Sequence, residues 1–191
     1  MKSAFKKQLN AVAALFGTIA VLSIAAFGHC DTMDGPVVKA AQEALRTKNI
    51  NHVLIWVHAT EEAEVRQAFT DASKVRRLGR DARMLADKYF FETVVRLHRA
   101  GEGEPYTGLK PTGTAGAKLF VEIDNAIEKN SLSELISRFP ADEQTKIEDH
   151  FRNVIDKKKF GVNDVEAGRR YVESYVTFLH LLEKIEGHGE G

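Results

Sequence analysis

Residues 86–98, ADKYFFETVVRLH, and residues 168–180, GRRYVESYVTFLH, align without a gap at an offset of 82 residues. Both stretches carry tyrosine at the fourth position and histidine at the last, with apolar residues at matched places between them. The same offset pairs further apolar residues and glycines along the chain: Leu54 with Ile136, Val65 with Ile147, Phe69 with Phe151, and Gly79 with Gly161. A core that is specified twice gives this pattern, so the sequence predicts an internal repeat.

We therefore expect an all-α fold of two pseudo-symmetric repeats, each of about four helices, packed as one bundle-like domain. The first repeat covers residues 37–100 and the second covers 119–186, with matched positions as far as residue 182. No stretch alternates polar and apolar residues for long enough to indicate a strand. Residues 187–191 form a glycine-rich tail after the second repeat.

Capping and helix-breaking residues set the expected helix ends. Thr60 precedes three acidic residues and predicts an N-cap, Gly79 and Gly101 predict helix stops, and Pro140 predicts a first-turn position. The predicted helices cover residues 37–48, 50–57, 60–77 and 80–99 in the first repeat, and 119–129, 131–138, 140–158 and 163–186 in the second.

The segment at 101–118 connects the repeats and is too rich in glycine and proline to be helical. One interpretation is a solvated linker. The other is an ordered loop, held by Tyr106, Leu109 and the prolines, that covers a site. In the second interpretation Glu102, Tyr106 and Lys110 are the candidate ligand-binding residues of the loop.

Residues 1–28 have the three parts of a secretory signal peptide. Lys2, Lys6 and Lys7 give a basic start, an apolar run of 17 residues extends from Ala11 to Phe27, and the segment ends in Ala-Phe-Gly. Cleavage after Gly28 would export the chain to the periplasm or the medium. The alternative is an uncleaved anchor, because the run is at the lower limit for spanning a bilayer.

Composition limits the partners of the processed chain. Without the three leader lysines it carries 24 basic and 27 acidic residues, which argues against nucleic-acid binding. We expect no stable membrane span after cleavage. Cys30 is the only cysteine, so no internal disulfide can form, and a homo-oligomer or a Cys30-linked dimer is expected instead.

The predicted cleavage would create a metal chelate at the new N-terminus, the segment 29–36. The free amine and imidazole of His29 and the thiolate and amide nitrogen of Cys30 suit square-planar Ni(II) or Cu(II). Asp31 and Asp34 add oxygen ligands or hold the segment in place. The alternative is that this segment begins a disordered tail.

The segment His29-Cys30-Asp31-Thr32-Met33-Asp34-Gly35 resembles the nickel hook of nickel superoxide dismutase. That family also begins with His-Cys after processing and carries a second cysteine before a glycine. Asp34 occupies the place of the second cysteine, and Met33 that of the preceding proline. The resemblance implies a metal-binding terminus, while the dismutase chemistry of the family depends on two thiolates.

The body of the chain resembles a different group, exported bacterial helical proteins of unknown function. The resemblance rests on YFFETVVRLHRAGEGEPYTGLKP at 89–111 together with the His-Cys-Asp start. It spans most of the processed chain and implies no catalytic residues.

His98 and His180 occupy equivalent places in the two repeats, each four residues after a valine. If both lie on the apolar side of their helices, they approach each other and serve as metal ligands, oriented by Glu102 and Glu183. The alternative is a pair of core histidines hydrogen-bonded to backbone or to carboxylates. Gly101 is expected to end the helix before Glu102.

Two other groups have simpler interpretations. His52 and His58 flank Trp56 and are expected at the surface. Arg76, Arg77, Arg80 and Arg83, with Asp81 and Asp87 close by, are expected to form a solvated, ion-paired helix junction rather than an anion site.

The sequence therefore predicts an exported metal-binding protein, with nickel or copper held by His29, Cys30, Asp31 and Asp34 and completed by His98 or His180. Redox activity is open, as is catalysis. The alternative is a non-catalytic binding or scaffold protein that uses the connecting loop and the surface of the repeats.

Overall fold

The fold is described from a computed structural model that covers residues 30–114 and 117–188. The predicted leader and His29 lie outside the described residues. Seven α-helices and two 3-10 turns make up this part of the chain, which confirms the all-α prediction. The helices are α2 (Pro36–Thr47), α3 (Asn51–Leu54), α4 (Glu62–Val75), α5 (Arg80–Gly101), α6 (Ala117–Lys129), α7 (Ala141–Lys157) and α8 (Val165–His188).

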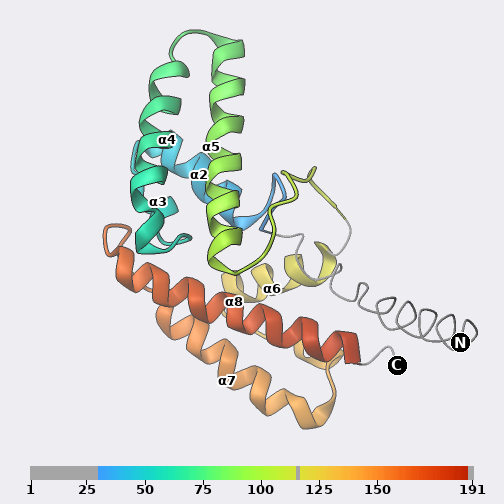
Figure 1. The fold of residues 1–191 in the computed structure, drawn as a ribbon. Helices are drawn as coiled ribbons and strands as arrows, with labels where there is room; N and C mark the ends of the chain where they lie inside the picture. Colours follow the sequence, from blue (N-terminus) through green and yellow to red (C-terminus); the bar gives the residue numbers. More distant parts are fainter. Residues whose placement is uncertain (1–29, 115–116, 189–191) are drawn as a thin grey trace, which may run out of the picture.

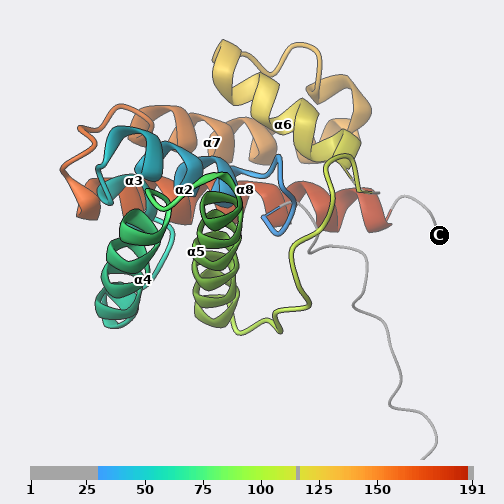
Figure 2. The ribbon, with the colours of Figure 1, turned by 90° about the horizontal axis from the view of Figure 1, so that it is seen from above.

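Two antiparallel hairpins form the frame of the molecule (Figure 1). Helices α4 and α5 pack along each other, and α7 and α8 do the same. The C-terminal end of α5 stands close to α8, while the α4–α5 turn points away from the second hairpin (Figures 1 and 2). Helix α2 packs on α5 and α6 packs on α7, so each hairpin is covered by one more helix.

Helix α5 belongs to the core only along its C-terminal half. From Phe90 to Arg99 eight of ten side chains are buried, whereas from Arg80 to Tyr89 only Ala86 is. The apolar positions of the inner half recur at helical spacing and pack on α2 and α4. The outer half therefore projects beyond the core with its partner α4.

A glycine lets the two hairpins approach closely. A Cβ atom added to Gly168 of α8 would lie 2.2 Å from Cγ2 of Ile55, in the segment that follows α3. That separation is far below van der Waals contact, so only glycine allows α8 this close to Ile55.

Most long helices lie within three residues of the predicted ends, but the short elements differ. The helix predicted at 50–57 is the four-residue α3 followed by turns. The helix predicted at 131–138 is a set of turns ending in the 3-10 turn η2 (Ile136–Arg138). There Ser133 donates its backbone N–H to the Ser131 hydroxyl, which replaces a helical bond.

Two predicted caps are also wrong. The chain enters α4 through the 3-10 turn η1 (Ala59–Glu61), whose N-cap is His58 and not Thr60. The Thr60 hydroxyl donates to the Glu61 carboxylate instead of a backbone amide. Pro140 is the N-cap of α7, one position before the first turn.

The order of elements is the same in the two halves of the chain, with a helix, a short turn region and a long hairpin in each. The pseudo-symmetry of the repeats stays a prediction. None of the described helices combines the length and apolar composition needed to cross a bilayer.

Candidate functional site

The start of the described chain is docked into the fold. Asp31 and Thr32 are buried, and Thr32 forms a parallel bridge with Lys110 of the connecting loop. The backbone N–H of Lys110 donates to the Asp31 carbonyl at 2.9 Å, and that of Met33 donates to the Lys110 carbonyl at 3.0 Å. Residues 31–33 are therefore fixed beside the loop, and the disordered-tail alternative is wrong for this part of the segment.

The connecting loop packs on the core. Tyr106 and Leu109 are partly buried against it, as the ordered-loop alternative predicts. Lys110 donates its ammonium group to the Thr107 hydroxyl at 2.7 Å and so closes a turn inside the loop. The candidate loop residues thus hold the loop and the N-terminal segment together.

Arg99 is the buried charge at this junction. Its guanidinium, only 4% exposed, forms ion pairs with Glu102 at 3.1 Å, Asp31 at 3.6 Å and Glu104 at 3.8 Å. Three carboxylates around one guanidinium leave the cluster with an excess of negative charge. Burial raises the pKa of Asp31 to about 6, although Arg99 and Lys110 act in the opposite direction.

The Cys30 side chain packs against the core next to this cluster. Burial raises the pKa of the Cys30 thiol well above its usual range, and the Glu102 and Asp31 carboxylates raise it further. A cation at this place would favour the thiolate, because it offsets both the burial and the carboxylates.

His98 is a buried histidine with one nitrogen held by backbone. Its Nδ1 donates to the Trp56 carbonyl at 2.9 Å, and its ring packs edge-on against the Trp56 indole. Burial lowers the pKa of the imidazole. The neutral ring therefore carries its lone pair on Nε2.

That Nε2 atom faces a carboxylate instead of a donor. The Glu102 Oε1 atom lies 3.4 Å away, and within the described residues Nε2 has no hydrogen-bond partner. Helix α5 ends at Gly101, as predicted, but its C-cap Glu102 keeps a right-handed helical backbone conformation, so His98 and Glu102 still face each other one turn apart. The His98 Nε2 and Glu102 Oε1 atoms both accept, and at this distance they could bind one cation placed between them.

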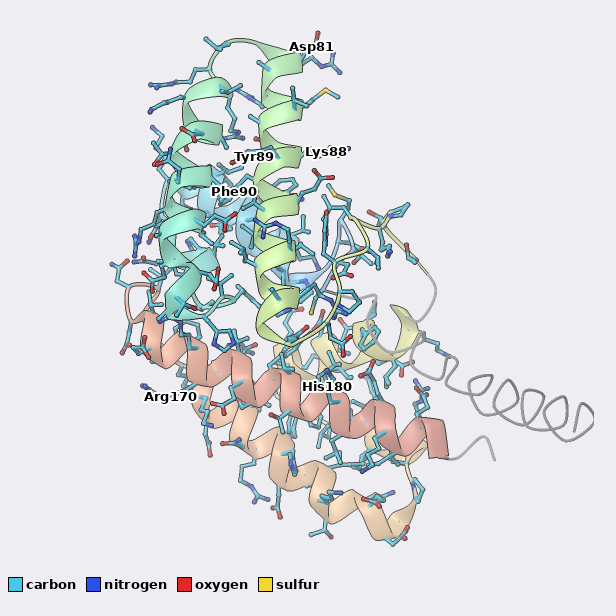
Figure 3. The ribbon with its side chains drawn as sticks, in the orientation of Figure 1. Asp81, Lys88, Tyr89, Phe90, Arg170 and His180 are labelled. Atoms are coloured by element: carbon cyan, nitrogen blue, oxygen red, sulfur yellow. The ribbon has the colours of Figure 1, made fainter. Side chains whose placement is uncertain are left out.

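His180 is not the structural equivalent of His98. It lies on an exposed side of α8, whereas His98 is 4% exposed, so the prediction that both lie on the apolar side is wrong for His180. Figure 3 shows His180 on α8. Glu183, one turn further along, is half-buried; its pKa is raised to about 7 by burial and by the charge of Glu102. Glu183 therefore interacts electrostatically with the acidic junction, the cluster of carboxylates around Arg99 that includes Glu102.

The remaining predicted ligand, Asp34, lies in the turn before α2 with its side chain half-exposed. No three His, Cys, Asp or Glu side chains within 30–114 and 117–188 are placed to hold one metal ion. The described residues therefore supply a pair, His98 and Glu102, and Cys30, which is among them, does not complete a group of three.

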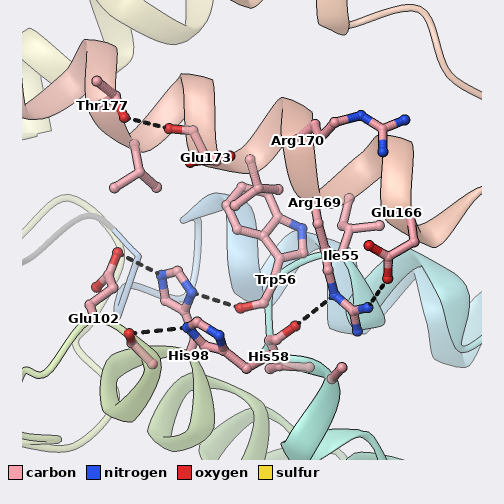
Figure 4. Close-up of a pocket in the computed structure, with 15 residues that line it drawn as sticks. Ile55, Trp56, His58, His98, Glu102, Glu166, Arg169, Arg170, Glu173 and Thr177 are labelled. Carbon is pink, nitrogen blue, oxygen red and sulfur yellow. Dashed lines mark hydrogen bonds and ion pairs between the residues drawn. The ribbon is translucent and has the colours of Figure 1, made fainter.

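A cavity of about 600 Å³ lies against the same two residues (Figure 4). It separates the end of α5 from α8, and Trp56 and His58 form its inner wall. Arg169 on the opposite side donates to the Val57 carbonyl and to Glu62, so it ties the two hairpins together. His58 is exposed, as the sequence predicted; its ring also lines the cavity and donates to the Gly101 carbonyl at 3.2 Å.

Comparison with known proteins places the chain among proteins of undefined activity. A model of a family of unknown function (DUF6448) matches residues 34–181. No curated protein and no solved structure matches the chain.

Proposed function

Since the chain belongs to that family of unknown function, its activity has to be inferred from the site, and we propose that it is an exported metal-binding protein. His98 and Glu102 form the body half of the site, and His29 and Cys30 at the processed N-terminus complete it. The observation that supports the proposal is the buried Nε2 atom of His98 facing a Glu102 oxygen at 3.4 Å.

The spacing of the two atoms suits a metal ion. Bonds of about 2.1 Å to nitrogen and oxygen give a ligand separation of about 3.4 Å in a tetrahedral site and about 3.0 Å in a square-planar one. Glu102 therefore has to move by roughly half an ångström to serve Ni(II) or Cu(II). A glutamate at the end of a helix can make that adjustment by side-chain rotation.

The docking of residues 31–33 beside the loop supports a role for the N-terminal segment in completing the site. The Cys30 thiol is close enough to Glu102 for that carboxylate to raise its pKa. Burial of Asp31 against Arg99 fixes the segment, so we assign Asp31 a positioning role and leave the ligand role to Cys30 and His29. Metal would supply Lewis acidity or, in the case of copper or nickel, redox capacity at this junction.

The test compares metal binding by the exported protein and three variants. Metal-free protein is titrated with nickel, copper and zinc, and the N-terminal residue is identified by mass spectrometry. We expect Cys30→Ser and Glu102→Gln to weaken binding at least about tenfold. Glu104→Gln is the matched control, because it removes a neighbouring carboxylate that contacts Arg99 but not His98, and it should bind metal like the wild type.

Two results would reject the proposal. One is a mature terminus at any residue other than His29. The other is equal binding by wild type, Cys30→Ser and Glu102→Gln. Tight binding of zinc with none of nickel or copper would keep the site and reject the assigned metals.

A second candidate function is the binding of a small molecule in the cavity between the hairpins. Its volume is within the range of ligand sites, and Trp56 offers an aromatic wall beside the exposed cation of Arg170. Thermal stabilisation of the metal-free protein by a panel of small carboxylates and amines would support it. An Arg170→Ala variant that responds like the wild type would count against it.

A further inference from the structure

The outer end of the α4–α5 hairpin carries large apolar side chains that the core does not use. Leu78 in the turn is 79% exposed, and Met84 and Leu85 in the first turns of α5 are 63% and 70% exposed. Val75 and Tyr89 extend this surface along the hairpin, where they line a groove of about 500 Å³. Monomeric soluble proteins rarely gather such residues at one end without a use for them.

The same end is strongly basic. Between residues 74 and 85 the chain has five basic residues and one acidic residue, although the processed chain as a whole is acidic. Arg76 is paired with Asp87 on α5. The other four, Lys74, Arg77, Arg80 and Arg83, are exposed and form no ion pair within the described residues, so the predicted ion-paired junction is limited to Arg76.

We propose that this hairpin end, residues 74–89, docks on the surface of a bilayer that contains anionic phospholipid. Phosphate groups of the lipid would meet the four exposed cations, and the side chains of Leu78, Met84 and Leu85 would enter the boundary with the acyl chains. The inference is independent of the metal site, which lies at the opposite end of α5.

The distances along α5 fit shallow insertion. At 1.5 Å per residue, Met84 and Leu85 lie about 6–8 Å from the start of α5. End-on insertion of the hairpin by that distance, which is close to the depth that interfacial segments reach, would bring both residues to the boundary with the acyl chains. Tyr89 lies about 13 Å from the start, at the level of the headgroups, where tyrosine is enriched. The long arginine side chains can reach back to the same level. Figure 3 shows Asp81 at the outer end of α5 and Tyr89 further in.

Two features of the hairpin end favour a lipid surface over a protein partner. A second copy would bring two basic ends together, and their charges would repel each other. Met84 and Leu85 are adjacent on a helix and so point about 100° apart, with Leu78 at the apex. Apolar groups that surround an apex suit a fluid layer better than one face of a rigid protein.

The experiment is flotation of the full exported chain with vesicles of phosphatidylcholine alone or mixed with phosphatidylglycerol. We expect binding only to the anionic vesicles, with a marked loss on raising the salt concentration. Leu78→Ser/Leu85→Ser and Arg77→Glu/Arg80→Glu should each lower the partition coefficient at least about tenfold. Control variants are Val121→Ser, an exposed valine on α6, and Arg46→Glu/Arg152→Glu, which make the same charge change elsewhere.

A fluorescence readout separates insertion from charge attraction. In a Leu78→Trp variant we expect a blue shift of the new emission on adding anionic vesicles, whereas the native Trp56 is buried and should not respond. Equal binding to both vesicle types, or unchanged binding by the two hairpin variants, would overturn the proposal. The proposal would also be overturned if the wild-type protein sedimented as a dimer and the Leu78→Ser/Leu85→Ser variant sedimented as a monomer.

Discussion

Glu183 shows how the acidic junction acts on a single residue. Its pKa of about 7 in the folded protein exceeds the ordinary value near 4.5, because burial and Glu102 disfavour the ionised form. A carboxyl group with a raised folded pKa contributes stability below its unfolded pKa and loses that contribution as the pH rises through its folded value. Above about pH 7 the ionised Glu183 therefore lowers the free energy of unfolding.

We predict that Glu183→Gln raises the free energy of unfolding by about 1–2 kcal/mol at pH 8 and leaves it nearly unchanged at pH 4. The measurement is urea unfolding of metal-free protein at both pH values. Glu173→Gln, which makes the same substitution at an exposed position of the same helix, is the control. A Glu183→Gln benefit of the same size at both pH values would contradict the electrostatic origin.

At the residue scale the sequence indicated some of the site and missed its centre. Cys30, Asp31, His98 and Glu102 could be predicted as candidates from their chemistry and from their place beside a predicted cleavage site or a glycine. Arg99 was missed, because arginine is usually exposed. A signal was present: Arg99 follows Val95 by one helical turn and so falls on the apolar stripe of α5.

At the scale of elements, the crossing of the two hairpins depends on Gly168. A methyl group there would overlap the Ile55 side chain, and either α8 or the segment after α3 would have to shift. We predict that Gly168→Ala lowers the free energy of unfolding by about 1–3 kcal/mol.

Gly187→Ala is the matched control for this prediction. Gly187 is in the same helix, and nothing lies within 4 Å of its added Cβ. Its replacement should stabilise the protein by up to about 1 kcal/mol through helix propensity. Equal effects of the two substitutions in thermal unfolding would show that propensity, not close packing, decides at residue 168.

The long helices could be predicted because they carry their own boundaries. Gly79 separates α4 from α5, and every long helix shows an apolar stripe of helical period. The short elements could not be predicted, because η1 and η2 depend on local side-chain hydrogen bonds and on packing against the hairpins. How the hairpins cross was also beyond the sequence, because Gly168 looks like any other glycine until Ile55 is placed beside it.

At the scale of the whole molecule, Arg99 joins three separate parts of the chain: the N-terminal segment, α5 and the connecting loop. We predict that Arg99→Met destabilises the protein by about 3–5 kcal/mol, because it leaves buried carboxylates without their cation. Arg96→Met, one turn earlier at an exposed ion pair with Glu64, should cost no more than about 1 kcal/mol.

Hydrogen exchange gives this prediction a second readout. In Arg99→Met the backbone amides of Met33 and Lys110, which bond the segment to the loop, should exchange faster than those in the middle of α7. Uniformly faster exchange would mean that Arg99 supports the fold in general and has no particular role at the junction.

The bridge between Thr32 and Lys110 also sets an order of events in folding. Its two residues are 78 positions apart, so the contact closes a long loop and gains little until α2 to α5 have brought its ends together. The segment at 30–35 should therefore be among the last parts to reach its place and among the first to leave it. Folding thus runs against the direction of synthesis here: the residues made first wait for a partner that is made much later.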